Sequence, residues 1–273
     1  MESNMLNGGS RAFACGLLLA LGACGSDISR PDKAFHVVFV SMGQVPATEA
    51  APNLFQFAKT STAFESIEAT PGNPLALSAS MLTGLTPAEH GAGGGEAGTS
   101  VLAASQTPLP EYLGDHGYIT GAVLASDCNM PPESGLNQGF LDYQAIPGNA
   151  TDVAVLADDW VEHHWRQPFF LFVHLPVGEQ ANGPERADEA LGVLLKGLAA
   201  RGLLDATLVV VTANRGAGPL LYIKAPGQRT ANTDNRPVQL LHIPRLMLRY
   251  MALPVAAVRP NSYFTHPLTA PPE

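Results

Sequence analysis

The sequence has little charge, and positive charge is the scarcer kind. Charged residues make up 14% of the 273 residues, and 15 lysines and arginines stand against 24 acidic residues, for a net charge of -9. No basic stripe is present that could neutralise phosphates, so nucleic acid is not an expected partner. Hydrophobic residues make up 46%, which is enough for most of the chain to fold around a core rather than stay disordered.

Cysteine is also scarce. The chain contains only Cys15, Cys24 and Cys128, and the first two fall in the N-terminal segment described next. A single remaining thiol cannot form an internal disulfide, and no spacing of Cys and His suggests a zinc site. No obvious base lies near Cys128 in the sequence, so a small apolar filler is favoured over a nucleophile.

The N-terminal segment 1–23 is typical of an export signal. Arg11 precedes an apolar run over 12–23 that is too short to cross a bilayer as a helix. The run ends in LGAC at Leu21–Cys24, and a small residue directly before a cysteine resembles the lipobox of bacterial lipoproteins. This resemblance implies cleavage before Cys24, a diacylglycerol on its sulfur, and an exported protein anchored to a bacterial membrane, periplasmic or on the outer face. The alternative is a plain signal peptide with an incidental cysteine.

After a polar tether at 24–34, apolar runs typical of buried strands alternate with helical patterns. The expected strands are 36–41, 119–126, 168–175 and 207–213, and the expected helices are 52–61, 75–84, 109–117, 152–165, 185–202 and 238–254. Strands separated by helices indicate parallel βα units. We therefore predict an α/β fold, a three-layer α/β/α sandwich with a mostly parallel central sheet in which 36–41, 168–175 and 207–213 are neighbours. The Pro-rich segment 257–273 is expected to be a surface tail.

Two consecutive segments of the chain resemble the sequences of a known family. PNLFQFAKTSTAFESIEATPG at 52–72, followed by ASMLTGLTPAEHGA at 79–92, resembles the sulfatase family of the alkaline phosphatase superfamily. Further phrases agree in the same order, among them SGLNQGFLDY at 134–143 and ADEALGVLLKGLAARGLLDATLVVVTA at 187–213. The resemblance extends over nearly all of the chain that follows the tether. It implies an alkaline phosphatase-like fold for a domain at 35–256.

The family's metal site is degenerate in this sequence. Its members hold a divalent metal such as calcium, magnesium or zinc with carboxylates from two strand ends, plus a histidine in some. By this resemblance, Gly43 stands at the first metal-binding aspartate and is followed by Gln44. In the second metal-binding turn, Asn214 replaces the aspartate and Arg215 replaces the histidine. None of these side chains is anionic, so we expect no metal cofactor.

The family's nucleophile is missing as well. By the resemblance, Pro74 stands at the nucleophile position, where the family has its cysteine or threonine, and Ser78 replaces the arginine or histidine usually found four residues later. Ser78, Ser80 and, less directly, Thr70 stay open as substitute nucleophiles, but small hydroxyls that allow close helix packing are the favoured interpretation. Glu179 takes the place of a substrate-facing histidine, where a carboxylate would repel an anionic ester.

Arg215 has two interpretations. Its guanidinium could bind an anion where the family has its metal, or it could neutralise local carboxylates or lie in solvent. His174 falls on an expected buried strand, which favours a satisfied core histidine over a ligand.

Other patterns have simpler explanations. One helix carries Asp158, Asp159, His163 and His164, but an apolar stripe through Val153, Leu156, Trp160 and Val161 marks these polar residues as its solvated face. A formal dinucleotide motif at Gly93, Gly95 and Gly98 lacks the preceding strand that such a motif needs, so a flexible loop is favoured.

These observations favour a sulfatase-like lipoprotein that has lost catalysis and acts as a binding or structural protein. Its expected partners are a membrane, through Cys24, and an anionic small molecule or a protein. The alternative is a divergent hydrolase of sulfate or phosphate esters that keeps or rewires the family cleft.

Overall fold

The computed structural model describes a defined part of the chain. The described residues are 34–44, 51–68, 70, 72–94, 100–126, 128, 130–177, 183–213 and 220–255. Cys24, Glu179, Asn214 and Arg215 lie outside these ranges, as do segment 1–23 and tail 257–273, so the predictions for them stay predictions.

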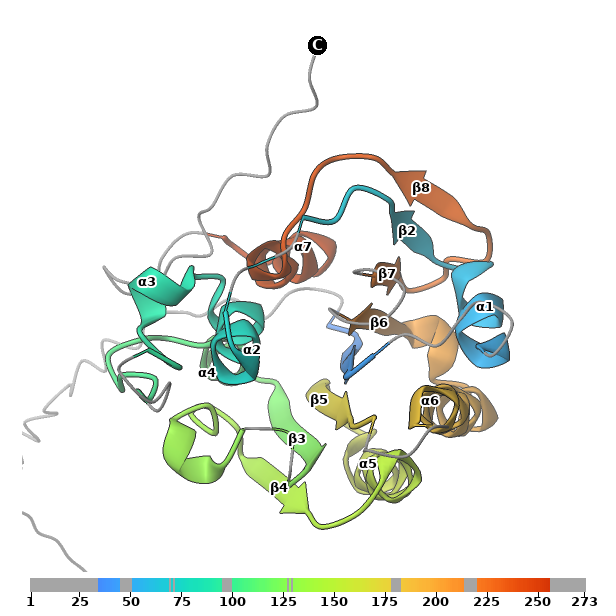
Figure 1. Ribbon diagram of the computed structural model, residues 1–273. Coiled ribbons are helices and arrows are strands. Elements are labelled where there is room, and N and C mark those ends of the chain that lie inside the picture. The colour runs from blue at the N-terminus through green and yellow to red at the C-terminus, as the bar shows by residue number, and fades with distance from the viewer. Residues whose placement is uncertain are drawn as a thin grey trace, which may run out of the picture.

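Within the described residues, eight strands form one sheet. They are β1 (His36–Met42), β2 (Thr62–Phe64), β3 (Ile119–Ala125), β4 (Asp142–Ile146), β5 (Phe169–Leu175), β6 (Thr207–Ala213), β7 (Leu220–Lys224) and β8 (Asn232–Asp234), and their order is β4-β3-β5-β1-β6-β7-β2-β8. Only β7 runs antiparallel to its neighbours, β6 and β2. The predicted mostly parallel sheet is confirmed, with β5, β1 and β6 adjacent at its centre (Figure 1).

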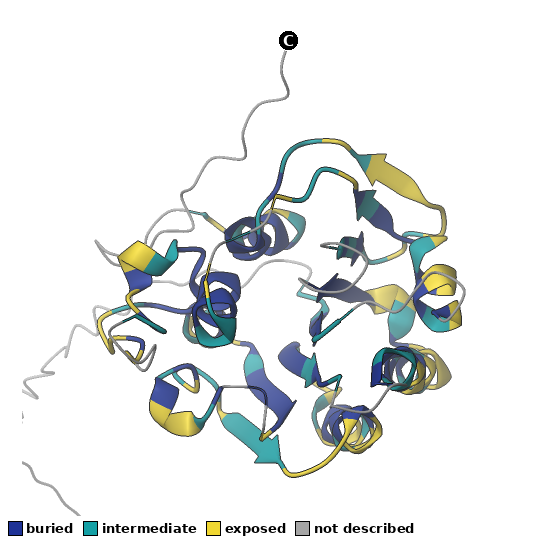
Figure 2. Ribbon diagram, viewed as in Figure 1, coloured by how far each residue is buried: buried dark blue, intermediate teal, exposed yellow. Residues whose placement is uncertain are grey.

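Helices cover both faces of the sheet. One face packs against α1 (Pro52–Ala58), α5 (Ala150–His164) and α6 (Gly183–Ala200), and the other against α2 (Pro74–Thr83), α4 (Leu109–Asp115) and α7 (Ile243–Tyr250). Alternate residues of β1 supply the two cores, since Val37 and Phe39 face α2 while Val38 and Val40 face α6. Burial on both faces explains why the central strands are continuous apolar runs (Figure 2).

The remaining elements are short. They are α3 (Pro87–His90) and the 3-10 turns η2 (Pro132–Ser134), η3 (Leu204–Ala206) and η4 (Leu240–His242). The helix expected at 238–254 is therefore wrong in its extent: η4 precedes α7, which ends at Tyr250. Pro244, in the first turn of α7, explains the break because it has no backbone N–H to continue an earlier helix. In the part of the chain that the structure covers, no helix combines the length and apolarity needed to cross a membrane.

A buried carboxylate joins α1 to α6. Asp188, on α6 and 1% exposed, accepts hydrogen bonds from the backbone N–H groups of Asn53 (3.0 Å) and Leu54 (2.8 Å) at the start of α1. The side-chain amide of Asn53 donates to the same carboxylate at 2.9 Å. A Cβ on Gly192, one turn further along α6, would lie 2.4 Å from Oδ1 of Asn53, so glycine allows this close approach. Asp188 thus satisfies the first N–H groups of α1, which lack helical partners.

Candidate functional site

The central strands end together at one edge of the sheet. Met42, the last residue of β1, pairs with Leu175 of β5 and with Ala213 of β6. The segments that follow these three parallel strands therefore leave the sheet side by side, at the edge where open α/β sheets bind ligands. Gly43 and Gln44 follow β1 there, whereas Asn214 and Arg215 follow Ala213 in the sequence and lie outside the described residues.

Gly43 brings no functional group to this edge. Its backbone N–H donates to the carbonyl of Leu175 at 3.0 Å. A Cβ at this position would lie 2.9 Å from Cγ2 of Val177 and 3.4 Å from the Val177 nitrogen. The space that a larger side chain would need is thus filled by a β-branched residue with little rotamer freedom. Gln44 adds only a neutral amide, half-exposed.

Val177 is held from the other side by the start of α6. A Cβ on Gly183 would lie 1.7 Å from the carbonyl oxygen of Val177 and 2.9 Å from its Cγ1. Glycines at the end of β1 and at the start of α6 therefore enclose Val177 between them. The sequence prediction missed this contact, because Gly43 and Gly183 follow different strands and only the fold brings them to Val177.

The start of α2, where the family's nucleophile would stand, is closed by local contacts. Pro74 is the first helical residue, and the Oδ1 atom of Asn73 caps the helix by accepting the N–H of Ala76 at 2.9 Å. The Nδ2 group of Asn73 donates to the carbonyl of Gly93 at 2.9 Å. Gly93 has a φ of 75°, and a Cβ on it would lie 2.5 Å from Oδ1 of Asn73.

The glycine run expected to be a flexible loop therefore has a packing role where the structure describes it, at Gly93 and Gly94. Gly95 and Gly98 lie outside the described residues. Gly93 follows α3 rather than a strand, in keeping with the rejection of a dinucleotide motif.

Ser80 has a histidine partner, but the direction of the hydrogen bond between them does not suit catalysis. Its Oγ lies 3.1 Å from Nε2 of His90, and Nδ1 of His90 accepts the backbone N–H of Ala92 at 3.1 Å. We therefore assign the ring proton to Nε2, which donates to Ser80. Such a neutral imidazole cannot also take the proton of Ser80 as a general base. Both side chains are buried, and this burial lowers the pKa of His90, which favours the neutral form.

The other candidate hydroxyls also have structural surroundings. Thr70 Oγ1 accepts the N–H of Leu240 at 3.3 Å, which joins the segment before α2 to η4. Ser78 is 5% exposed, in the second turn of α2. Cys128 is buried in the core on the α2 side of the sheet, in keeping with its interpretation as an apolar filler. His174 lies on β5 between Ser41 of β1 and Leu124 of β3, and it is partly rather than fully buried.

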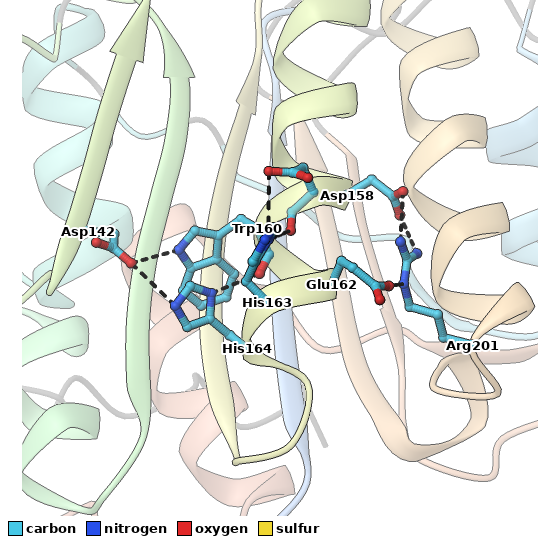
Figure 3. A network of polar contacts seen from close by, with 8 residues as sticks. Asp142, Asp158, Trp160, Glu162, His163, His164 and Arg201 are labelled. Carbon is cyan, nitrogen blue, oxygen red and sulfur yellow. Dashed lines mark hydrogen bonds and ion pairs between the residues drawn. The ribbon is translucent and has the colours of Figure 1, made fainter.

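The acidic residues of α5 form ion pairs with α6 (Figure 3). Arg201, just after α6, binds Asp158 through Nη1 at 2.6 Å and Glu162 through Nε at 2.6 Å. A Cβ on Gly197 would lie 1.8 Å from Oδ1 of Asp158, so glycine leaves room for this pair. These carboxylates hold two helices together.

Both histidines of α5 lie near carboxylates. His163 and Asp159 lie 3.7 Å apart with side chains 66% and 64% exposed. His164 lies 3.6 Å from Oδ2 of Asp142 on β4, and the indole N–H of Trp160 donates to the same oxygen at 2.9 Å (Figure 3). Across the described ranges, no group of three or more His, Cys, Asp or Glu side chains could hold a metal ion. These residues stabilise the solvated side of α5.

Comparison with solved structures defines the fold class: the chain has an alkaline phosphatase-like fold. The protein BT4656, solved in complex with its substrate D-glucosamine-2-N,6-O-disulfate, is similar with a TM-score of 0.68 and 14% identity, over 83% of this chain and 78% of that one. A member of the alkaline phosphatase superfamily from Vibrio parahaemolyticus has a TM-score of 0.66 and 18% identity, over 82% and 67%. The putative sulfatase yidJ from Bacteroides fragilis has a TM-score of 0.61 and 15% identity, over 80% and 74%.

At the level of sequence, no protein-family model and no curated protein matches the chain. The structural likeness therefore defines the fold, and the activity has to be argued from this chain's own residues.

Proposed function

We propose that this chain is a sulfatase-like lipoprotein that has lost metal-dependent ester hydrolysis and acts as a binding or structural protein. The observation that carries the proposal is the contact between Gly43 and Val177 at the end of β1. A strand end that would have to supply a metal-binding carboxylate carries no side chain, and the adjacent space is filled by valine.

The donor set does not fit a divalent metal. Calcium, magnesium and zinc need several anionic oxygens or imidazoles that converge on one point. The family positions supply Gly43, the amides of Gln44 and Asn214, and Arg215. A guanidinium at this place would repel a dication rather than bind it. The mismatch between a divalent metal and these four positions therefore follows from the side-chain chemistry of the residues themselves.

The nucleophile position supports the same proposal. Pro74 has no heteroatom that could attack an ester, and Asn73 uses its side chain to cap α2. Ser80 is the hydroxyl with a histidine beside it, but its oxygen accepts a hydrogen bond from Nε2 of His90, so the imidazole does not take up the serine proton. Groups that act as one catalytic unit lose activity together, so restoring any one of them should not restore turnover.

The proposed location follows from the N-terminal sequence. LGAC at Leu21–Cys24 supports a lipid anchor at Cys24, which would hold the folded domain on an exported membrane face. Arg215 is the proposed contact for an anionic ligand at the carboxyl edge of the sheet, because guanidinium groups bind oxyanions in a bidentate manner.

Two measurements on the purified protein test the loss of catalysis. Elemental analysis should find no stoichiometric calcium, magnesium or zinc, and assays with aryl sulfate and aryl phosphate esters should show no turnover above background. A mock purification from the same host is the control for contaminating hydrolases. Stoichiometric metal, or turnover that a chelator abolishes, would overturn the proposal and favour a divergent hydrolase instead.

A further inference from the structure

A pocket lies at the carboxyl edge of the sheet, but on the β8 side rather than at Gly43. It has a volume of about 210 Å³ and is lined by Phe64, Arg236, Leu246, Arg249 and Tyr250. Phe64 ends β2 and pairs with Asp234 at the end of the parallel strand β8, so both strands deliver residues to this edge. Leu246, Arg249 and Tyr250 come from α7, which lies beside the loops that follow these strands in Figure 1.

The pocket carries a net positive charge in an acidic protein. Asp234 binds Arg236 by accepting from Nε at 2.9 and 3.0 Å and from Nη2. These hydrogen bonds hold the pKa of Asp234 below its usual range, so this carboxylate stays ionised and neutralises one guanidinium. Among the described residues the Arg249 side chain has no short hydrogen bond or ion pair, but its charge also acts on Asp234 and helps to lower the pKa of that carboxyl. Asp234 is therefore one carboxylate facing two guanidinium groups, which leaves one positive charge at the pocket of a chain whose net charge is -9.

The two arginines differ in how well they are prepared for a ligand. Asp234 fixes the orientation of Arg236, which leaves its Nη1 group available for an acceptor. An oriented guanidinium loses less conformational entropy when it binds an oxyanion. Arg249 is exposed at the end of α7 and can adjust to the ligand. The pocket is thus lined by one oriented guanidinium, Arg236, and one adjustable guanidinium, Arg249.

The rest of the lining is apolar and the space is small. Phe64, Leu246 and Tyr250 offer two aromatic rings and a branched side chain. Sites for drug-sized ligands usually enclose about 300–1,000 Å³, so this pocket suits a smaller molecule. Its shape and charge call for one anionic group attached to one apolar ring.

We propose that this pocket binds a small aryl oxyanion, a single aromatic ring that bears one carboxylate, sulfate or phosphate group. Arg249 and Arg236 contact the anionic group, and Phe64, Leu246 and Tyr250 contact the ring. The pocket lies on the same sheet edge as Gly43 but is lined by different residues, so the proposal stands whether or not the chain hydrolyses esters.

Benzoate and its neutral analogue benzamide test the proposal by calorimetry on the purified full chain. We expect saturable binding of one benzoate and at least tenfold weaker binding of benzamide. Arg249→Gln should weaken benzoate binding tenfold or more, because a hydrogen bond to a charged group is lost. Arg249→Lys keeps the charge, so its affinity for benzoate should lie between those of the parent chain and Arg249→Gln. Its thermal unfolding checks that the fold is intact.

Two matched variants locate the binding. Arg166→Gln removes the same charge from an exposed position beside Trp165, outside the pocket, and should bind benzoate like the parent chain. Arg215→Gln should also leave benzoate binding unchanged. A loss of binding in Arg215→Gln, with normal binding in Arg249→Gln, would overturn this inference and support the Arg215 site instead. Equal binding of benzoate and benzamide, or no saturation below about 10 mM, would also overturn it.

Discussion

Cγ2 of Val177 lies 2.9 Å from the point that a Cβ on Gly43 would occupy. The two residues follow adjacent parallel strands, and their contact fills the sheet edge at which the sequence resemblance to sulfatases predicts the first metal-binding position. Conversion of Gly43 into a metal ligand would thus require the chain to move Val177, which Gly183 holds from the other side.

Gly43→Ala should lower the free energy of unfolding by about 1–3 kcal/mol, because an added methyl group overpacks a filled space. Urea unfolding measures the change. Gly114→Ala is the matched control, since a Cβ there has no neighbour within 4 Å, and it should not destabilise the protein. In a Val177→Ala background the cost of Gly43→Ala should shrink. Equal costs in both backgrounds would contradict the contact.

Gly43→Asp should destabilise the protein further and still bind no metal. One carboxylate does not make a dication site beside Gln44, Asn214 and Arg215, and Pro74 remains at the nucleophile position. Metal titration and ester assays on this variant check the expectation. Turnover restored by this single change would show that the other positions are less degenerate than the sequence implies.

Asp188→Ala should lower the free energy of unfolding by about 2–6 kcal/mol, because the buried N–H of Leu54 and the part-buried N–H of Asn53 lose their acceptor at about 1–3 kcal/mol each. Asp188→Asn keeps one acceptor oxygen and should cost less. Glu189→Ala, the exposed neighbour on α6, is the control and should change little. If Asp188→Ala and Glu189→Ala behave alike in urea unfolding, Asp188 does not cap α1.

His90 should make the protein less stable in mild acid. Burial lowers its folded-state pKa, so below about pH 6.5 the unfolded chain takes up a proton that the folded chain resists. Unfolding then binds protons, and the free energy of unfolding falls as the pH drops from about 6.5 through the folded pKa. His90→Gln should flatten this decline when unfolding is measured at about pH 7.5 and about pH 5.

Some decline should remain in His90→Gln, because burial also lowers the pKa of His36, which stacks on Phe169. His36→Gln should remove a further part of it. An unchanged pH dependence in His90→Gln would mean that His90 takes up a proton as readily in the folded chain as in the unfolded one, which is incompatible with Nδ1 accepting the backbone N–H of Ala92.

Cys24→Ala should abolish labelling of the full chain by a fatty-acid probe in a bacterial host and leave unprocessed precursor. The reason is that a lipoprotein is cleaved before the cysteine that carries its lipid. Cys15→Ala lies inside the proposed signal and is the control that should be labelled normally. Persistent labelling of Cys24→Ala would remove the lipoprotein proposal.

The central sheet could be predicted because its strands are buried on both faces. Continuous apolar runs such as Val37–Val40 need two cores, and two cores imply helices on both sides. The outer strands gave no such signal: β4 is half-buried throughout, and β8 is a polar segment of three residues. The antiparallel direction of β7 could have been predicted from the sequence. Only residues 214–219 separate it from β6, and a parallel crossover needs a dozen residues or more.

The loss of the candidate site stays a prediction from the sequence, and the packing around it could not be predicted. The sequence alone shows that Pro74 and Gly43 lack reactive groups. It does not show that Val177 fills the space beside Gly43, because that contact joins segments more than a hundred residues apart. The pocket at Arg249 was missed for the same reason, since its lining comes from β2, the end of β8 and α7.

The β8 border of the sheet also affects self-association. β8 is an outer strand of three residues whose Asn232 and Thr233 are exposed, as the yellow arrow in Figure 2 shows. A neighbouring copy that tried to extend the sheet there would find little backbone to pair with and no apolar side chains to bury. Short polar border strands of this kind oppose the growth of a sheet across molecules, so the β8 border is a poor template for pairing with a second copy.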